Sequence, residues 1–517
     1  MKFPVSDPQG HGHPFTQPRR AQRRFVTSSR ELLSEARKTF KDRIFRIMTD
    51  LGEVMFLPHQ LAEEIKNDHR FSFTTAFEKD FHAGIPGFET AELGGLENGL
   101  LQLIARKQLT RNLGKFHTVP SAMGQLGREL STPLSDETAN ALAINFESSG
   151  GPGLANRRFE FKLLTQAAQV WTEVVAKDRV LDIIARVSSR IYLGDEVCRN
   201  ARWLAITKLY TTHFFTAATK LRMYPRIVRH LVHWFISECK LLRSQLNDAQ
   251  KILEPIVHRR RGLHREALAT GEPVPKFDDA LGWVEREAAA KFVDCNPSIF
   301  QLLLSTVSIN TTSDLLEQCM LCIAQDPRII GPLREEIQNV LRHRGWSKSS
   351  LSEMKLLDSV IKESQRLKPT SIAAMRRRVE EDVTLSNGVT LKRGMRVYVD
   401  ASRMWDPNLH HHPEQWDGYR FLKLRSFPGR ERMAQLASTS PDHLAFGHGE
   451  HACPGRFLAI SVIKIVLCHL LLKYDWMLSP GTDVKPVTNG ILVVSSPTAR
   501  LLIRRRRGAA AAPGVIE

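Results

Sequence analysis

Apolar residues recur with a mainly helical period through the middle of the chain, from about residue 102 to residue 310. Within this region, Trp171–Ile191 carries apolar residues every three or four positions, which predicts one long amphipathic helix. A further helix is predicted over Ser298–Gln325, where a few polar residues interrupt a long apolar run. The pattern therefore indicates a mainly α protein.

Shorter elements are predicted on either side of this region. The helices are expected from Ser28 or Ser29 to Phe40, and over Pro58–Lys66, Pro332–Leu341, Lys355–Leu367 and Pro454–Tyr474. Strands are expected as a hairpin of Phe45–Met48 with Val54–Leu57, within Val383–Leu391 and Met395–Val399, and as a last pair, Gly490–Val494 with Arg500–Arg504. The Gly- and aromatic-rich segment Phe71–Gly95 is predicted to be a loop that lines a ligand mouth. The fold class is thus a large helical body with a small sheet at each end of the chain.

The composition fits one cofactor-sized domain in a reducing compartment. The chain has 517 residues and no Gly/Ser linker, so we predict a single domain over 25–505, between a polar basic tail (1–24) and a C-terminal tail (506–517). Seven cysteines without a framework argue against disulfides, and Cys319 and Cys322 are interpreted as core residues. No run reaches the roughly 18 apolar residues that a membrane span needs, and no secretory signal is expected.

The formal charge of +18 raises the question of an acidic partner. Nucleic acid is not expected, because the chain has no zinc-finger spacing, RNA-binding signature or basic-aromatic stripe. Solvated faces, an acidic membrane surface or an acidic electron-donor protein remain as interpretations of the basic clusters. The segment Trp203–Leu242 mixes aromatic and basic residues, and it is either helix core or a lid that touches a membrane face.

The most informative stretch is the loop that leads from Phe446 into Cys453. Pro454 follows as the expected first residue of a helix, which places Cys453 at the N-cap, where free N–H groups and the helix dipole stabilise a thiolate. Gly449 and Gly455 let the backbone approach a flat ligand, and Phe446 can shield the sulfur from water. The alternative is a buried structural cysteine at a helix start.

This F-x-x-G-x-x-x-C-x-G pattern resembles the signature of the cytochrome P450 family. The resemblance covers residues from about 23 to 504 and implies the cytochrome P450 fold, with Cys453 as the axial ligand of a haem iron. It further implies a monooxygenase that takes electrons from NADPH through NADPH-cytochrome P450 reductase and uses dioxygen to oxidise a small lipophilic substrate.

Two further motifs gain meaning from this resemblance. Glu363 and Arg366 form E-x-x-R on one helix face, and Arg420 matches the family arginine that closes a buried triad and braces the haem-thiolate core. Thr311 matches the oxygen-side threonine that relays protons, and Asn310 takes the place of the usual acid. Because an amide cannot carry a proton as a carboxylate does, we expect the relay to run through Thr311 and water.

Cations are needed for the haem propionates. His451 and one of Arg376 or Arg377 match the family positions, and Arg106 or Lys107 is a weaker candidate because the usual W-x-x-x-R is not evident. Each arginine is equally well explained as a solvated surface residue. Substrate contacts are expected from the Phe71–Gly95 loop, Ser308, Thr312, residues 370–374, Ile491 and Leu492 in an apolar pocket.

Several stretches, such as Pro86-Gly-Phe88 and Lys473-Tyr-Asp-Trp476, are similar to fungal members that act on terpenoid or indole-terpenoid skeletons. The resemblance implies the cytosolic face of the endoplasmic reticulum, although the usual membrane anchor is not evident in this chain, so a cytoplasmic or peripheral location is the alternative. Residues 118–131 look like an insertion. The missing anchor and the insertion are either real or artefacts of the gene model.

Two other functions stay open. A haem-thiolate isomerase or dehydratase would rearrange a peroxide without a reductase, but such relatives often lack the threonine found at Thr311. An inactive haem-binding protein is the other alternative, given the missing anchor and the extra segment. Activity with NADPH and a reductase separates the monooxygenase from both.

Overall fold

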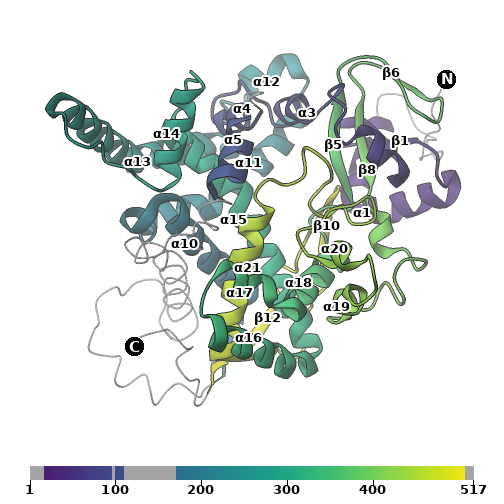
Figure 1. Ribbon diagram of the computed structural model, residues 1–517. Coiled ribbons are helices and arrows are strands. Elements are labelled where there is room, and N and C mark those ends of the chain that lie inside the picture. The colour runs from purple at the N-terminus through teal and green to yellow at the C-terminus, as the bar shows by residue number, and fades with distance from the viewer. Residues whose placement is uncertain (1–16, 96–98, 110–170, 507–517) are drawn as a thin grey trace.

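The computed structural model describes residues 17–95, 99–109 and 171–506 (Figure 1). The predicted insertion at 118–131 lies outside these residues. The α-helices are α1 (Gln17–Phe40), α2 (Ala62–Ile65), α3 (Phe73–Asp80), α4 (Glu89–Gly95), α5 (Leu100–Leu103), α10 (Ala176–Val197), α11 (Ala201–Arg222), α12 (Arg226–Val232), α13 (Ser237–Thr270), α14 (Ala280–Ala290), α15 (Pro297–Gln325), α16 (Ile330–Arg344), α17 (Lys348–Glu353), α18 (Lys355–Leu367), α19 (Arg420–Arg425), α20 (Glu431–Ala434) and α21 (Arg456–Lys473). Short 3₁₀ or π turns are η1 (His59–Leu61), η2 (Ile104–Leu109), η4 (Pro327–Ile329) and η5 (Ser402–Trp405).

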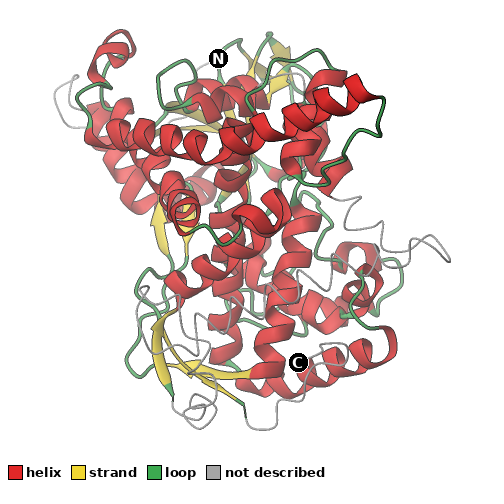
Figure 2. Cartoon of the chain, turned by 90° about the vertical axis from the view of Figure 1, so that its left-hand side faces the viewer, coloured by secondary structure: helices red, strands yellow, loops and turns green. Residues whose placement is uncertain are grey.

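The strands lie in small sheets around this helical body (Figure 2). They are β1 (Phe45–Thr49), β2 (Gly52–Leu57), β3 (Phe71–Ser72), β4 (Thr172–Val175), β5 (Ala373–Val379), β6 (Val383–Thr384), β7 (Thr390–Leu391), β8 (Arg396–Asp400), β9 (Tyr474–Leu478), β10 (Val487–Asn489), β11 (Leu492–Val494) and β12 (Arg500–Arg505). The largest sheet has the order β1-β2-β8-β5-β3, and β4-β12-β9 forms a second one. The predicted fold class, mainly α with a small β region, is confirmed.

Helix α15 runs through the centre of the helical body (Figure 1). Asn296 caps it by accepting hydrogen bonds from the N–H groups of Ser298 and Ile299, and Pro297 supplies the preset backbone angle of the first turn. Most of its residues are buried, because α10, α11, α13 and α18 pack around it. The Ser298–Gln325 helix predicted from the sequence is confirmed, and Cys319 and Cys322 are fully buried within it, as expected of core residues.

The predicted hairpin near the N-terminus is also confirmed. Strands β1 and β2 pair antiparallel from Phe45 with Phe56 to Thr49 with Gly52, and Gly52 has the positive φ of 96° that this turn needs. The β2 strand then pairs in parallel with β8. Helix α1 starts earlier than predicted, at Gln17, and Ser28 forms a kink in it with non-helical backbone angles.

Three predicted elements were wrong. Segment Phe71–Gly95 is largely helical, because the Ser72 hydroxyl caps α3 by accepting a hydrogen bond from the Thr75 N–H. Trp171–Ile191 is not one helix, since β4 precedes α10 and pairs with β12. The expected last pair of strands does not form: β11 pairs with β10, whereas β12 lies between β4 and β9.

The segment Trp203–Leu242 was interpreted either as helix core or as a lid that touches a membrane face, and its two helices differ in burial. Helix α11 buries Trp203, Tyr210 and Phe214 in the core. Helix α12 buries none of its residues, and Ile227 and Leu231 on it are exposed. Within the described ranges, no helix combines the length and the hydropathy needed to cross a bilayer.

Candidate functional site

A cavity of about 480 Å³ lies between α15, β5, the start of α21 and the loop that carries Cys453. Its wall is mostly apolar and comes from elements that are far apart in the chain. The apolar lining residues include Phe73, Phe77, Leu303, Leu304, Val307, Leu315, Ala373, Met375, Phe446, Leu458, Val462, Ile491 and Leu492. The volume falls within the range of small-molecule and cofactor sites.

Cys453 lies on the wall of this cavity, on the loop before α21. Its backbone N–H donates to the carbonyl of Phe446 at 2.8 Å, and this bond closes the loop. Helix α21 starts at Arg456 with Gly455 as N-cap, so the predicted start at Pro454 and the N-cap position of Cys453 were wrong. The Arg456 guanidinium holds the loop by donating to the carbonyls of Cys453 and Ala437.

The electrostatics of the Cys453 thiol are set by opposing effects. Burial raises its pKa, and hydrogen bonds from the backbone N–H groups of Gly455 and Arg456, together with the Arg456 charge, oppose that rise. The sequence predicted a thiolate stabilised by the helix start. In the protein alone burial outweighs this stabilisation, and a cation bound at the sulfur would tip the balance toward the thiolate.

Helix α15 forms another part of the cavity wall. Thr311 faces the cavity, and its hydroxyl donates to the carbonyl of Val307 at 3.1 Å and is 3.3 Å from that of Ser308. Ser308 and Thr312 line the same space, together with residues 370, 371, 373 and 374. Asn310 does not reach the cavity wall, and its side-chain Nδ2 is buried without a hydrogen-bond partner among the described residues.

Glu363, Arg366 and Arg420 contact one another and are not among the residues that line the cavity. Arg366 donates two hydrogen bonds to the Glu363 carboxylate at 2.7 and 2.9 Å, and both side chains are fully buried. Arg420 Nε donates to the same carboxylate at 3.0 Å. The two arginines also bind the carbonyls of Met404, Pro413 and His411, so the triad ties α18 to the segment that precedes α19.

Cations gather at one end of the cavity. Arg377 is 2 % exposed, and its Nε is buried without a hydrogen-bond partner among the described residues. Burial lowers its pKa to about 10. His451 lines the cavity beside Phe73, and burial with the Arg377 charge lowers its pKa. Arg106 also lines the wall and donates to the carbonyl of Glu450.

The other two cation candidates are engaged by partners. Arg376 lines the cavity, but its guanidinium lies 3.8 Å from the Asp80 carboxylate and stacks over the rings of Phe81 and Tyr398. Lys107 pairs with Glu287 at 2.9 Å and does not line the cavity.

Sequence reasoning missed two groups of residues at this site. Tyr192 of α10 is fully buried, lines the cavity and hydrogen-bonds Ser308, and its burial raises its pKa to about 12. Lys368 pairs with Asp314, whose carboxylate also accepts the Ser495 N–H at 2.7 Å. This cluster ties α15 to the segment after β11. Buried polar residues inside apolar helices were the available signal, but their partners are remote in sequence.

These residues fit a haem. The cavity offers a sulfur beside backbone N–H donors, an apolar wall for a porphyrin, and a buried cation with an unpaired donor for a carboxylate. Gly455 lines the space, and a Cβ built on it would meet no atom of the described residues within 4 Å, so the backbone there leaves room for a bound group.

Known proteins support this reading of the fold. The sequence profile of the family described as Cytochrome P450 matches residues 164–503. A solved structure, cyanobacterial CYP120A1 with retinoic acid bound, shares the fold with a TM-score of 0.65 at 17 % identity, over 94 % of this chain and 96 % of that one.

Curated fungal relatives are much closer in sequence. Cytochrome P450 monooxygenase 2 of Gibberella fujikuroi is 45 % identical over 94 % of this chain and 86 % of its own length. Cytochrome P450 monooxygenase hepE of Aspergillus oryzae is 39 % identical over 94 % of this chain and 83 % of its own. By sequence and by fold, this chain belongs to the cytochrome P450 family, as an oxidoreductase of the monooxygenase type.

Proposed function

We propose that this protein binds haem through Cys453 and hydroxylates a small lipophilic molecule, a terpenoid-type fungal secondary metabolite. The observation that carries the proposal is the position of Cys453 on the wall of a mostly apolar cavity that Thr311 of α15 also lines. An apolar wall with few polar groups favours a lipophilic substrate. The terpenoid class rests on the similarity to fungal members noted in the sequence.

The residues around the cavity divide the work of such a site. Cys453 would hold the haem iron through its thiolate, Arg377 would supply positive charge for the propionates, and the neutral His451 ring would offer a hydrogen-bond donor. The triad of Glu363, Arg366 and Arg420 would brace α18 against the segment that precedes α19. When bound, the haem supplies the chemistry that activates dioxygen.

Thr311 is the proposed proton-handling group. Its hydroxyl donates back to its own helix, so its oxygen lone pairs are available toward the cavity, where they can accept a hydrogen bond from water. Asn310 holds a helix position next to it, and we propose only a supporting role for its amide. The apolar wall limits other water in the space.

Electrons are proposed to come from NADPH through NADPH-cytochrome P450 reductase, in keeping with the family. The exposed residues of α12 support peripheral contact with a membrane, and the cytosolic face of the endoplasmic reticulum is the proposed location.

The deciding experiment is a carbon monoxide difference spectrum of the reduced protein. We expect the red-shifted Soret band of thiolate-ligated haem in the wild type and its loss in Cys453→Ala. Cys295→Ala, which removes another partly exposed thiol away from the cavity, should leave the band unchanged. A wild type without bound porphyrin, or a Cys453→Ala variant that keeps the band, would refute the proposal.

Turnover then separates the activities. With reductase and NADPH we expect oxidised product, and Thr311→Ala should reduce product formed per NADPH consumed by roughly tenfold or more, whereas Thr311→Ser should restore most of it. Product made from a peroxide without reductase would instead assign an isomerase or dehydratase. Bound haem with neither reaction across a lipophilic substrate panel would assign an inactive protein.

A further inference from the structure

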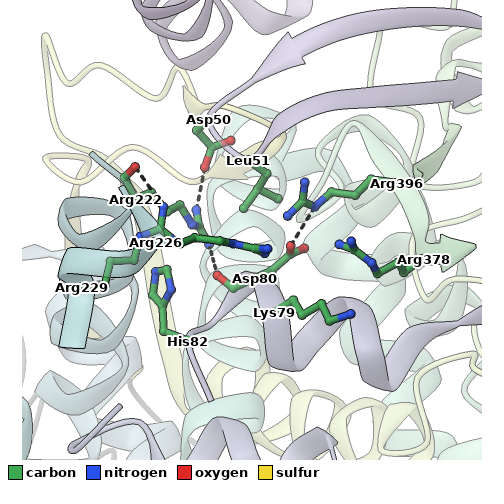
Figure 3. Close-up of a pocket in the computed structure, with 10 residues that line it drawn as sticks. All are labelled: Asp50, Leu51, Lys79, Asp80, His82, Arg222, Arg226, Arg229, Arg378 and Arg396. Carbon is green, nitrogen blue, oxygen red and sulfur yellow. Dashed lines mark hydrogen bonds and ion pairs between the residues drawn. The ribbon is translucent and has the colours of Figure 1, made fainter. Parts of the chain in front are cut away.

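A second pocket, of about 170 Å³, lies outside the haem cavity and is lined mainly by cations (Figure 3). The turn between β1 and β2, the end of α3, the junction of α11 with α12, and strands β5 and β8 meet around it. The residues are Asp50, Leu51, Lys79, Asp80, His82, Arg222, Arg226, Arg229, Arg378 and Arg396. Six of these side chains are lysine or arginine and two are carboxylates.

The two carboxylates are already engaged. Asp50 accepts a hydrogen bond from Arg222 at 2.6 Å, and the fully buried Asp80 accepts one from Arg396 at 3.1 Å. Arg222 also donates to the backbone carbonyl of Asp80 at 2.9 Å. These contacts neutralise two of the cations and hold their guanidinium groups on the pocket wall.

The remaining cations of the pocket are not neutralised by any carboxylate in the described part of the chain. Lys79, Arg226 and Arg378 form no ion pair with any residue that the structure describes, and Figure 3 shows all three at the same pocket. Among the described residues, the guanidinium of Arg229 donates to backbone carbonyls, those of Tyr224 and Arg222, and to no carboxylate.

Burial, followed by the charges of neighbouring arginines, lowers the pKa of Arg229 and of Arg378. His82 adds no positive charge near neutral pH, because burial lowers its pKa to about 4.

We propose that this pocket binds a phosphate group. Several arginines around one space match the planar, multidentate recognition of phosphate oxygens, and a dianion suits the excess of cations better than a single carboxylate does. The volume equals that of roughly five or six water molecules, which is enough for a phosphate group. The inference stands apart from the haem chemistry, because the pocket residues do not line the large cavity.

The phosphate comes either from a soluble ion or ester or from a lipid phosphate monoester. Arg226 is on α12, next to the exposed Ile227, so a lipid headgroup at a bilayer surface can reach the pocket as well as a soluble anion. Both sources present the same chemistry to the arginines, and they are distinguished by the probe.

The test is calorimetric titration of the full-length haem-loaded protein with inorganic phosphate and with pyrophosphate, in a phosphate-free buffer. We expect saturable binding that Arg226→Gln/Arg378→Gln weakens about tenfold or more, because two charge-assisted contacts are lost. Arg342→Gln/Arg432→Gln, which removes the same charge from exposed positions elsewhere, should bind like the wild type. Phosphate should also raise the melting temperature of the wild type and of this control.

Binding to lipid vesicles then distinguishes a lipid phosphate from a soluble one. Preference for phosphatidic acid over phosphatidylserine vesicles, lost in Arg226→Gln/Arg378→Gln, assigns a lipid phosphate, whereas binding of the free ions without that preference assigns a soluble one. Equal phosphate affinity in wild type and pocket variant, or a wild type that binds none of the probes, overturns the proposal.

Discussion

Two glycines in the Cys453 loop share a left-handed backbone but differ in their surroundings. Gly447 has φ of 69°, and a Cβ there would meet its nearest atoms at 3.8 Å. Gly449 has φ of 78°, but its Cβ would lie 2.5 Å from Lys66 Cβ and 2.7 Å from the Lys66 carbonyl oxygen. The loop is therefore packed tightly against the end of α2 at one glycine only.

This difference gives a matched pair of substitutions. Gly447→Ala should cost about 1–2 kcal/mol of unfolding free energy, which is the backbone strain alone. Gly449→Ala should cost clearly more and release haem more readily, because the backbone of Lys66 must move. Urea unfolding and the haem-to-protein absorbance ratio measure both effects. Equal losses in the two variants would contradict the close packing.

At the scale of elements, helix α15 carries a buried acid that the proposed mechanism does not use. Glu317 is 2 % exposed, and its Oε1 has no hydrogen-bond partner among the described residues. Burial, with a smaller effect of the Asp314 charge, raises its pKa from 4.5 to about 8.

Glu317 should therefore impose a pH dependence on stability. Between pH of about 4.5 and about 8 the unfolded chain has lost this proton and the folded chain still holds it, so the free energy of unfolding falls as pH rises. Glu317→Gln should flatten this slope and stabilise the protein by about 4 kcal/mol at pH of about 8. The exposed Glu335→Gln is the control. Urea unfolding at pH of about 5.5 and 8 measures the slope of unfolding free energy against pH in both variants. The same slope in Glu317→Gln as in the wild type would show that Glu317 is ionised in the folded protein.

The elements themselves were predictable where their signal was local. Periodicity predicts the long helix α15, turn residues predict the β1–β2 hairpin, and residue spacing predicts the E-x-x-R face of α18. Helices α3 and α4 were missed because they are short, and α3 also relies on packing of Phe77 against Phe73 and Phe81. The pairing of β12 with β4 joins residues distant in the chain, which no local pattern encodes.

The same limit applies to the site. The Cys453 loop and Thr311 stand out as motifs, whereas Tyr192 and the Lys368–Asp314 pair become visible only when α10, α15 and the C-terminal strands are brought together. The net direction of the Cys453 pKa shift could not be predicted from the sequence either, because it depends on how far burial outweighs the hydrogen bonds from nearby backbone N–H groups.

At the scale of the whole molecule, exposed apolar side chains gather in and beside α12. Met223, Ile227, Leu231, Trp234 and Phe235 are all exposed, Ile227 to 90 % and Phe235 to 82 %. A cluster of this kind is typical of an interaction surface. Its place at one end of the helical body suits contact with a membrane (Figure 1).

We expect Ile227→Asn/Phe235→Ser to bind phosphatidylcholine vesicles several-fold less than the wild type, because buried apolar area drives that binding. Phe292→Ser removes an apolar side chain that is 98 % exposed elsewhere and should leave binding unchanged. Co-sedimentation with vesicles measures both. If the Phe292 variant loses as much binding as the double variant, the effect is general hydrophobicity and not this surface.

One carboxylate stands between the two cavities. Asp80 holds Arg396 on the wall of the cation-lined pocket with one oxygen and faces Arg376, which lines the large cavity, with the other. Neutralising the Asp80 side chain would leave the guanidinium groups of Arg376 and Arg396 without this carboxylate partner. The two cavities are therefore coupled electrostatically through the Asp80 carboxylate. A substitution that changes the charge at one of them is expected to affect the other.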